Sequence, residues 1–266
     1  MNTMDMFRLD GQVAIVTGGS GVYGQHLCLG LCEAGALVVA AGNELDACEA
    51  AAAAFREAGH RAFAMHLDLS DETSINGLVD RVVERHGSLD TLVNCAVSRI
   101  GNANLEDATA AGWEASEKVN GVGTMLMTKT AVKQMRKQGK GNIINISSLM
   151  GVVAPNFPMY DSDDIVSGIE YTYTKFGLIG MTKWLAGYYG KYNIRVNCIS
   201  PGGNNIKGTK DEIRSQAVID AYLSLTPMNS FADEHDMKGP VVFLASDASK
   251  YVTGHNLIVD GGYSSW

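Results

Sequence analysis

QVAIVTGGSGVYG, the stretch from Gln12 to Gly24, decides the fold. Its first part, Gln12–Thr17, is a short run rich in apolar and β-branched side chains, which is typical of a buried strand. Glycines follow immediately, and the pattern from about Tyr23 to Glu33 is helical. A buried strand, a glycine turn and a helix in direct succession predict the opening unit of an alternating α/β fold.

The rest of the chain repeats this alternation. Buried strands are predicted at Gln12–Thr17, Leu37–Ala41, Arg61–Leu67, Leu89–Asn94, Asn142–Ser147, Ile194–Ser200 and Asn256–Asp260. Helices are predicted at Tyr23–Glu33, Glu44–Ala58, Glu72–His86, Trp113–Arg136, Tyr171–Tyr189, Asp211–Leu223 and His235–Ala245. This order predicts a parallel sheet covered by helices on both faces, as in a doubly wound Rossmann fold. No linker or repeat interrupts it, so we expect one domain over residues 1–266.

Composition and charge narrow the class of protein. Hydrophobic residues make up 46% and charged residues 19% of the chain, which is ordinary for a soluble globular protein. The formal net charge of −8 argues against nucleic-acid partners and against an anionic membrane surface. No apolar run of about 18 residues predicts a membrane span, and the first ten residues do not resemble a secretory signal.

The cysteines indicate neither a disulfide framework nor a metal site. There are five of them, an odd number without paired spacing: Cys28, Cys32, Cys48, Cys95 and Cys198. Cys28 and Cys32 share a predicted helix face, but a metal would need further ligands nearby, so we interpret them as core residues. Free thiols favour a reducing, cytoplasmic location.

The glycines after the first strand predict a phosphate-binding loop. Gly19, Gly21 and Gly24 satisfy G-x-G-x-x-G between a strand and a helix. Glycines there let the backbone approach a pyrophosphate, and the helix N-terminus then faces the phosphate charge. The alternative is a plain glycine-rich turn. A dinucleotide also needs its adenosine ribose bound near the end of the second strand, where Asn43 and Glu44 stand.

The choice between the two nicotinamide dinucleotides is predicted from charge. No Lys or Arg occurs from Leu9 to Phe55, whereas a 2′-phosphate normally requires a nearby cation. We therefore expect NAD in preference to NADP, with Asn43 or Glu44 near the ribose hydroxyls.

Tyr171 and Lys175 are a candidate acid/base pair. They stand four residues apart in a predicted helix and so project from one face. A phenol alone is a poor base at neutral pH, but a neighbouring ammonium stabilises the phenolate, which then takes a proton from a hydroxyl. Such a pair also occurs by chance on helix surfaces. Ser147 and Ser148 end the fifth strand and Asn120 lies in the preceding helix, which favours a functional constellation.

At this point the chain resembles the short-chain dehydrogenase/reductase family over nearly its whole length. The matching motifs stand in the family's order: TGGSGVYG at 17–24, Asp68, NCA at 94–96, Asn120, NISS at 145–148, YTYTK at 171–175, RVNCISPG at 195–202 and VTGHNLIVDGG at 252–262. The resemblance implies a sheet of about seven parallel strands, hydride transfer between a nicotinamide cofactor and a substrate alcohol or ketone, and a homotetramer.

The resemblance also assigns roles to individual residues. Tyr171 is then the acid/base, and Lys175 favours its ionised form and holds the nicotinamide ribose. Ser148 hydrogen-bonds the substrate oxygen, and Asn120 supports a water relay to Lys175. The residues expected at the cofactor are Gly18, Ser20, Gly21, Tyr23, Gly24, Asn43, Asp68, Leu69, Asn94, Ala96, Tyr171, Lys175, Pro201 and Gly202.

The chain departs from the family pattern at three places. Val22 stands where the family has the middle glycine of its phosphate loop, and Cys95 and Val97 stand within the usual N-N-A-G. Ser148 and Tyr171 are 23 positions apart, farther than is usual. Tyr160 lies at the usual distance, but its partner four residues later is Asp164, and a carboxylate does not stabilise a phenolate. We therefore expect an insertion near 155–169 beside the active site.

Two segments are expected to bind the substrate. Polar residues at 204, 205 and 207 lie in a predicted substrate loop and helix region near 203–232. The acids of the insertion, Asp161, Asp163, Asp164 and Glu170, either face water or line a polar pocket. Together these residues, and the resemblance to a subgroup that includes gluconate-type and other sugar-derivative dehydrogenases, favour a sugar, sugar acid or polyol.

Two other functions fit part of the pattern. A non-catalytic dinucleotide sensor would share the fold, but it would not require Asn120, Ser148, Tyr171 and Lys175 together. A methyltransferase also binds its nucleoside cofactor with a glycine loop, yet it would have no need for Tyr171 and Lys175.

Overall fold

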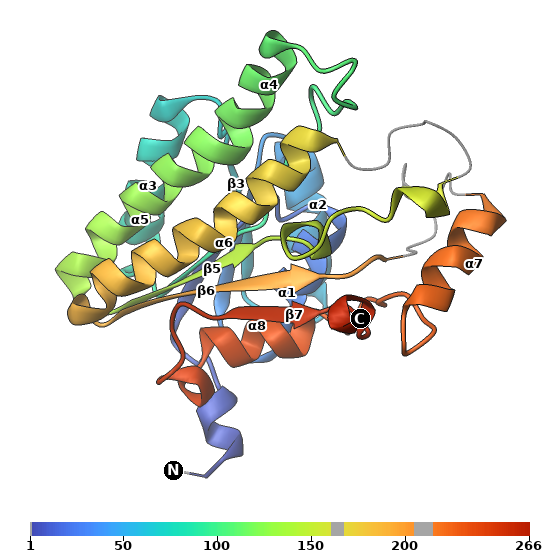
Figure 1. The fold of residues 1–266 in the computed structure, drawn as a ribbon. Helices are drawn as coiled ribbons and strands as arrows, with labels where there is room; N and C mark the ends of the chain where they lie inside the picture. Colours follow the sequence, from blue (N-terminus) through green and yellow to red (C-terminus); the bar gives the residue numbers. More distant parts are fainter. Residues whose placement is uncertain (1, 161–167, 205–214) are drawn as a thin grey trace.

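A computed structural model describes residues 2–160, 168–204 and 215–266 (Figure 1). Seven parallel strands form one sheet in the order β3-β2-β1-β4-β5-β6-β7. The strands are β1 (Val13–Thr17), β2 (Leu37–Gly42), β3 (Ala62–His66), β4 (Thr91–Asn94), β5 (Gly141–Ile146), β6 (Ile194–Pro201) and β7 (Asn256–Val259). The predicted strands and their parallel arrangement are therefore confirmed.

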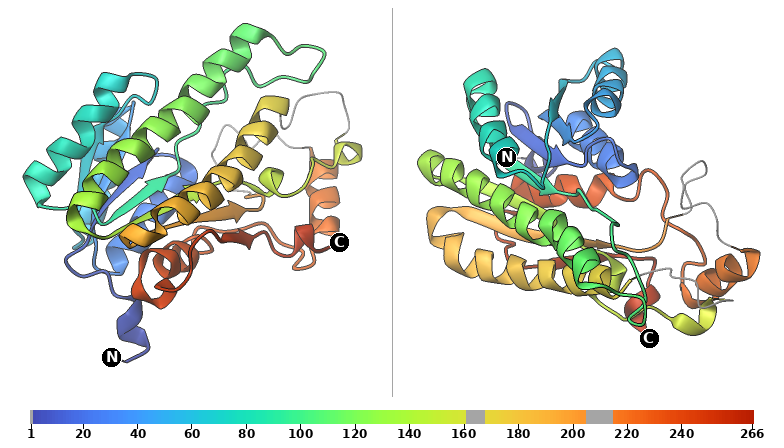
Figure 2. Two further views of the ribbon diagram at one scale, coloured as in Figure 1. Left: turned by 60° about the vertical axis from the view of Figure 1, so that its left-hand side comes forward. Right: turned by 90° about the horizontal axis from the view of Figure 1, so that it is seen from above.

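Helices cover both faces of this sheet, as Figure 2 shows from two further directions. The helices are α1 (Val22–Glu33), α2 (Leu45–Glu57), α3 (Glu72–His86), α4 (Ala110–Glu117), α5 (Thr124–Gln138), α6 (Ile169–Tyr189), α7 (Gln216–Leu225) and α8 (Lys238–Ala245). Successive residues of β1 point to opposite faces: Ala14 and Val16 pack with α1, α2 and α8, whereas Val13 and Ile15 pack with α3, α5 and α6. Every residue of β1 is buried, which explains its continuous apolar run.

Three helix predictions differ from the structure in detail. The helix predicted at Trp113–Arg136 is α4 and α5 joined by a π-helical segment, Lys118–Gly123. The helix predicted from Asp211 is described from Gln216 onward, and residues 205–214 lie outside the described parts. The helix predicted from His235 begins at Lys238, because carboxylates of Asp233 and Asp236 accept backbone N–H groups in the preceding turn.

The strand order places the functional edge of the sheet. The chain crosses from one side of β1 to the other between β3 and β4, so the loops after β1 and β4 diverge at the carboxyl edge. Thr17 joins these two loops, because its Oγ1 accepts hydrogen bonds from the backbone N–H groups of Cys95 (3.0 Å) and Ala96 (3.1 Å). In the described parts of the chain, no helix is long and apolar enough to cross a membrane.

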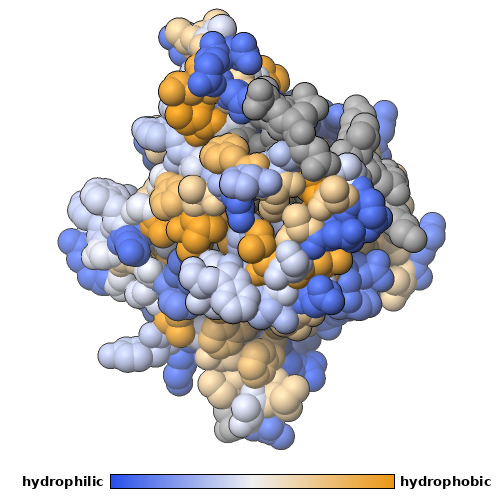
Figure 3. All heavy atoms as spheres, turned by 45° about the vertical axis from the view of Figure 1, so that its right-hand side comes forward, coloured by the Kyte–Doolittle hydropathy of each residue, from blue (hydrophilic) through white to orange (hydrophobic). Residues whose placement is uncertain are grey.

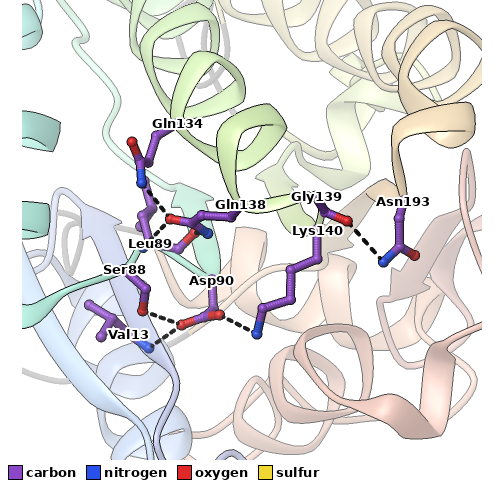
Figure 4. Close-up of polar contacts among 9 residues, drawn as sticks. All are labelled: Val13, Ser88, Leu89, Asp90, Gln134, Gln138, Gly139, Lys140 and Asn193. Carbon is purple, nitrogen blue, oxygen red and sulfur yellow. Dashed lines mark hydrogen bonds and ion pairs between the residues drawn. The ribbon is translucent and has the colours of Figure 1, made fainter.

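Asp90 connects strands at the opposite edge of the sheet, where the parallel strands begin (Figure 4). Its carboxylate accepts hydrogen bonds from the Val13 N–H (3.0 Å) and the Ser88 hydroxyl (2.8 Å), and Lys140 Nζ lies 2.8 Å away. These contacts join the starts of β1, β4 and β5 through a side chain that is 7% exposed. Burial alone would raise the pKa of Asp90, but the three partners outweigh it and lower that pKa below its ordinary value.

We expect Asp90→Asn to lower the free energy of unfolding at pH 7 by about 2 kcal/mol, because the amide is a weaker acceptor and cannot pair with Lys140. Since the folded pKa of Asp90 is depressed, its contribution is present above the unfolded value of about 3.9 and is lost as pH falls through the folded value. Urea unfolding at pH 7 measures the loss of unfolding free energy, and urea unfolding below pH ~4 measures how much of that loss remains in acid.

The matched control for this experiment is Lys140→Ala. The Lys140 side chain is 60% exposed, so its loss should cost less than about 1 kcal/mol. Equal costs for the two variants, or a cost of Asp90→Asn that does not shrink in acid, would contradict the assigned role of Asp90.

Candidate active site

One cleft of about 1260 Å³ lies along the carboxyl edge of the sheet. Figure 3 views the molecule with the carboxyl ends of β5 and β6 brought forward, and polar and apolar side chains are interspersed on this face. The cleft brings together most of the residues expected from the sequence: Gly18, Ser20, Gly21, Tyr23, Gly24, Asn43, Asp68, Leu69, Ala96, Ser148, Tyr171, Lys175, Pro201 and Gly202. Asn94 and Asn120 are buried and do not line it.

The glycines of the loop at the start of α1 pack so closely against neighbouring backbone that a side chain would not fit. Gly18 has φ +66°, and a Cβ there would lie 2.8 Å from the Ala96 Cα. A Cβ on Gly24 would lie 2.0 Å from the Gly18 carbonyl oxygen. Gly21 is the N-cap of α1 and has no side chain that could accept from the first N–H groups of the helix, and both Gly21 and Val22 line the cleft. This loop fits a pyrophosphate, and the helix begins at Val22, where the family usually has glycine.

Cys95, which differs from the usual family motif N-N-A-G, does not disturb the hydrogen bonds of the local backbone. Its N–H and that of Ala96 are both held by Thr17, and desolvation raises the pKa of the Cys95 thiol to about 11. The thiol is therefore neutral at neutral pH and adds no negative charge next to a phosphate-binding loop.

Acidic and amide groups gather at the end of the cleft formed by β2 and β3. Asn43 and Glu44 follow β2 and line the cleft, and Asp68 follows β3. Hydrogen bonds from the side chain and backbone of Ser70 lower the pKa of Asp68, one of them from the Ser70 N–H at 2.7 Å. Asp68 is thus an ionised acceptor, suited to the amino group of an adenine ring.

Tyr171 and Lys175 face the other end of the cleft from α6. Lys175 Nζ lies 5.5 Å from the centroid of the Tyr171 ring and donates a hydrogen bond to the Ile146 carbonyl at 2.8 Å. The Ser147 hydroxyl donates to the Lys175 carbonyl at 2.7 Å, which binds α6 to the end of β5. Ser148 lines the cleft, and its Oγ accepts the Met150 N–H at 3.1 Å. The arrangement places a phenol, an ammonium and a hydroxyl around one space.

Asn120 and Asn94 bind protein groups behind the cleft. Asn120 lies in the π-helical segment; its Oδ1 accepts the Ser98 N–H (2.7 Å) and its Nδ2 donates to the Ser98 carbonyl (2.8 Å). Asn94 Nδ2 donates to Thr128 Oγ1 and to Asn145 Oδ1, both at 2.9 Å. In this structure the Asn120 side chain therefore holds the loop after β4, and Asn94 joins β4 to α5 and β5.

A hydrogen bond crosses the cleft between the glycine loop and the loop after β6. Tyr23 donates its hydroxyl to the Gly202 carbonyl at 2.9 Å, and burial raises the pKa of Tyr23, so this donor stays protonated. The neighbouring Gly203 N–H donates to the Tyr222 hydroxyl at 2.6 Å. Tyr222 is itself stacked on Phe231, with ring centroids 4.6 Å apart. The backbone at Gly202 is therefore held from two sides.

The chain is similar to known dehydrogenases over nearly its whole length. A family model described as enoyl-(acyl carrier protein) reductase matches residues 21–264. The D-threitol dehydrogenase of Mycolicibacterium smegmatis is 33% identical, over 97% of this chain and 95% of its own length. The 2-dehydro-3-deoxy-D-gluconate 5-dehydrogenase of Escherichia coli is 34% identical, over 98% of each chain.

The chain belongs to the short-chain dehydrogenase/reductase family. It is an NAD(P)-dependent oxidoreductase. A crystal structure of a gluconate 5-dehydrogenase from Burkholderia cenocepacia J2315, in complex with NADP and tartrate, superposes with a TM-score of 0.89 at 29% identity, covering 100% of both chains. The relatives are dehydrogenases, so neither a non-catalytic sensor nor a methyltransferase has support.

The structure of this short-chain dehydrogenase adds residues that the sequence did not single out. These are Arg99 and Tyr222, which line the cleft together with the already noted Tyr160. Each comes from a segment without regular periodicity or from a distant helix, so no pattern pointed to it. The acids at 161, 163 and 164 and the polar residues at 205 and 207 lie outside the described residues. The alternative in which Glu170 faces water is wrong, because this side chain in the first turn of α6 is 2% exposed.

We expect Tyr23→Phe to raise KM for the cofactor about fivefold with a small change in kcat, because one hydrogen bond worth about 1 kcal/mol would no longer hold the loop at Gly202. Steady-state kinetics with varied cofactor measure the two constants separately. Tyr251→Phe is the control, since Tyr251 is fully exposed. An unchanged KM in Tyr23→Phe would show that the bond does not position the cofactor loop.

Proposed function

We propose that this protein oxidises a secondary alcohol of a small sugar, sugar acid or polyol, and reduces the corresponding ketone in reverse. The main observation in support is that one cleft holds the glycine loop at one end and Tyr171, Lys175 and Ser148 at the other. The relatives named above act on substrates of this kind, and the cleft lining contains hydroxyl and amide groups, such as Ser98, Tyr160 and Asn204, that suit such a ligand.

The proposed mechanism assigns one task to each group of the chain. A bound nicotinamide dinucleotide supplies the acceptor for hydride. Tyr171 takes the proton of the substrate hydroxyl during oxidation and returns it during reduction. Lys175 stabilises the phenolate by its charge and has hydrogen-bond donors for a ribose. Ser148 orients the substrate oxygen, and Asn120 acts indirectly by fixing the loop at Ser98.

Tyr171→Phe should lower kcat by at least about a hundredfold, because it removes the proton-transfer group and keeps the ring. The cofactor should still bind with nearly unchanged affinity, which fluorescence titration with the reduced dinucleotide measures. Tyr173→Phe is the matched control: it lies on α6 two residues away, is 60% exposed and does not line the cleft. Near-normal turnover by Tyr171→Phe would refute the mechanism.

We infer a preference for NAD over NADP from the charge next to the ribose site. Among the described lining residues, those at the end of β2 are Gly42, Asn43 and Glu44, and a carboxylate at 44 would repel a 2′-phosphate. The cations in the described part of the cleft lining are Arg99, Lys118 and Lys175, which come from the loop after β4 and from helical segments beyond it.

We therefore expect kcat/KM to be at least about tenfold higher with NAD than with NADP, equivalent to about 1.4 kcal/mol. Glu44→Arg should narrow or reverse this ratio, because it replaces repulsion of the 2′-phosphate by attraction. Glu49→Arg, on the same helix but outside the cleft lining, controls for the change in net charge. A preference of the unaltered protein for NADP would overturn the inference.

The cytoplasmic location and the homotetramer remain proposals. The proposal of a cytoplasmic location rests on five cysteines without paired spacing, because free thiols persist in a reducing compartment. Exposed apolar residues occur on α6, where Trp184 is 62% exposed and stacked on Tyr188, and at the C-terminus, where Trp266 is 81% exposed. A symmetric assembly would bury such surfaces.

A further inference from the structure

Arg99 places a positive charge beside the reacting phenol. It follows β4 at the carboxyl edge of the sheet and lines the cleft. Its guanidinium carbon lies 4.8 Å from the centroid of the Tyr171 ring. Among the described residues, no carboxylate lies within ion-pair distance of this guanidinium. As far as the described residues show, its hydrogen-bond donors can bind an anion that enters the cleft.

The backbone that carries Arg99 is fixed by buried groups. Asn120, which is 4% exposed, binds both the N–H and the carbonyl of the preceding Ser98. The Ile100 N–H donates to Ser98 Oγ at 3.3 Å, and the Asn102 N–H donates to the Arg99 carbonyl at 3.2 Å. Arg99 is thus an exposed side chain on a positioned backbone, which is the arrangement expected of a binding residue.

The acids of the described cleft lining stand at one end of the cleft, together with Lys118, and two cations stand at the reacting end. Among the described lining residues, the two acids are Glu44 and Asp68, both at the ends of β2 and β3, and the charge of Lys118 helps to lower the pKa of Asp68. The cations at the reacting end are Lys175 and Arg99. Lys175 is buried and bonded to the protein, whereas Arg99 is exposed in the cleft. The reacting end therefore favours a substrate with a negative group.

We propose that Arg99 binds the carboxylate of a small hydroxy acid while Tyr171 and Ser148 contact a secondary hydroxyl of the same molecule. A guanidinium presents parallel N–H donors that match the two oxygens of a carboxylate, and this geometry fixes orientation as well as affinity. This inference rests on the proposed function and narrows it to sugar acids and related hydroxy acids in preference to neutral polyols.

The test compares matched substrates that differ in the charged group: D-gluconate against D-glucitol, and D-galactonate against galactitol. The unaltered protein should have the higher kcat/KM for each acid. Arg99→Gln should raise KM for the acids by roughly tenfold to a hundredfold and change KM for the polyols by less than about twofold. KM for the acids in Arg99→Lys should lie between the values for the unaltered protein and for Arg99→Gln, because lysine keeps the charge and loses the planar pair of donors.

Arg136→Gln is the matched control. Arg136 also stacks on an aromatic ring, 4.4 Å from the Tyr192 centroid, but it does not line the cleft. It should leave acid and polyol kinetics unchanged. The inference would be overturned if the unaltered protein preferred polyols, or if Arg99→Gln lowered kcat for both classes without raising KM for the acids, which would assign Arg99 to proton transfer at Tyr171 alone.

A binding measurement separates this inference from the proposed function. Calorimetric titration of D-gluconate into the protein loaded with reduced dinucleotide requires no turnover. If no substrate of either class reacts, the proposed function fails, yet loss of gluconate binding in Arg99→Gln alone would still support the carboxylate site. If the unaltered protein and Arg99→Gln bound D-gluconate equally, or if neither bound it, the inference that Arg99 binds the carboxylate would be overturned.

Discussion

The burial of the Lys175 ammonium is the constraint on which the reacting end of the cleft depends. A charged group that is 5% exposed is costly unless it is hydrogen-bonded, and Ile146 O at the end of β5 is its acceptor within the described chain. The return bond from Ser147 to the Lys175 carbonyl fixes α6 on the same strand end. Because Tyr171 lies one helical turn earlier, the phenol is positioned by the bonds that satisfy the lysine.

The sheet supplies the rest of the site by bringing distant segments to one edge. Parallel strands end at the same edge, so the loops after β1, β2, β3, β4, β5 and β6 all reach the cleft. Side chains then join these loops: Thr17 holds the loop after β4, Asn120 holds it again at Ser98, and Tyr23 reaches the loop after β6 at Gly202. Catalytic geometry thus depends on bonds between loops as well as on the reacting groups.

The sequence was sufficient for features that depend on short periodic patterns. The continuous apolar run of β1 and the four-residue spacing of Tyr171 and Lys175 both reflect local geometry, so the strands, the fold and the closeness of these two side chains followed from them. The π-helical segment at Lys118–Gly123 did not, because it interrupts an otherwise regular helical pattern and is recognised only from its backbone bonds. The place of Arg99 in the cleft and the burial of Glu170 did not follow from the sequence, for a related reason. Their surroundings are set by tertiary contacts, one beside Tyr171 and the other buried, that no local spacing encodes.

The distribution of charge explains how a chain of net charge −8 accommodates anionic ligands. The glycine loop has no Lys or Arg from Leu9 to Phe55, so a pyrophosphate there would be bound by backbone N–H groups and the dipole of α1. Such groups act over a short range and do not attract polyanions from a distance. Cationic side chains stand at the reacting end, where Lys175 and Arg99 face the cleft. Local placement of charge, and not the net charge of the chain, therefore decides which anions the cleft accepts.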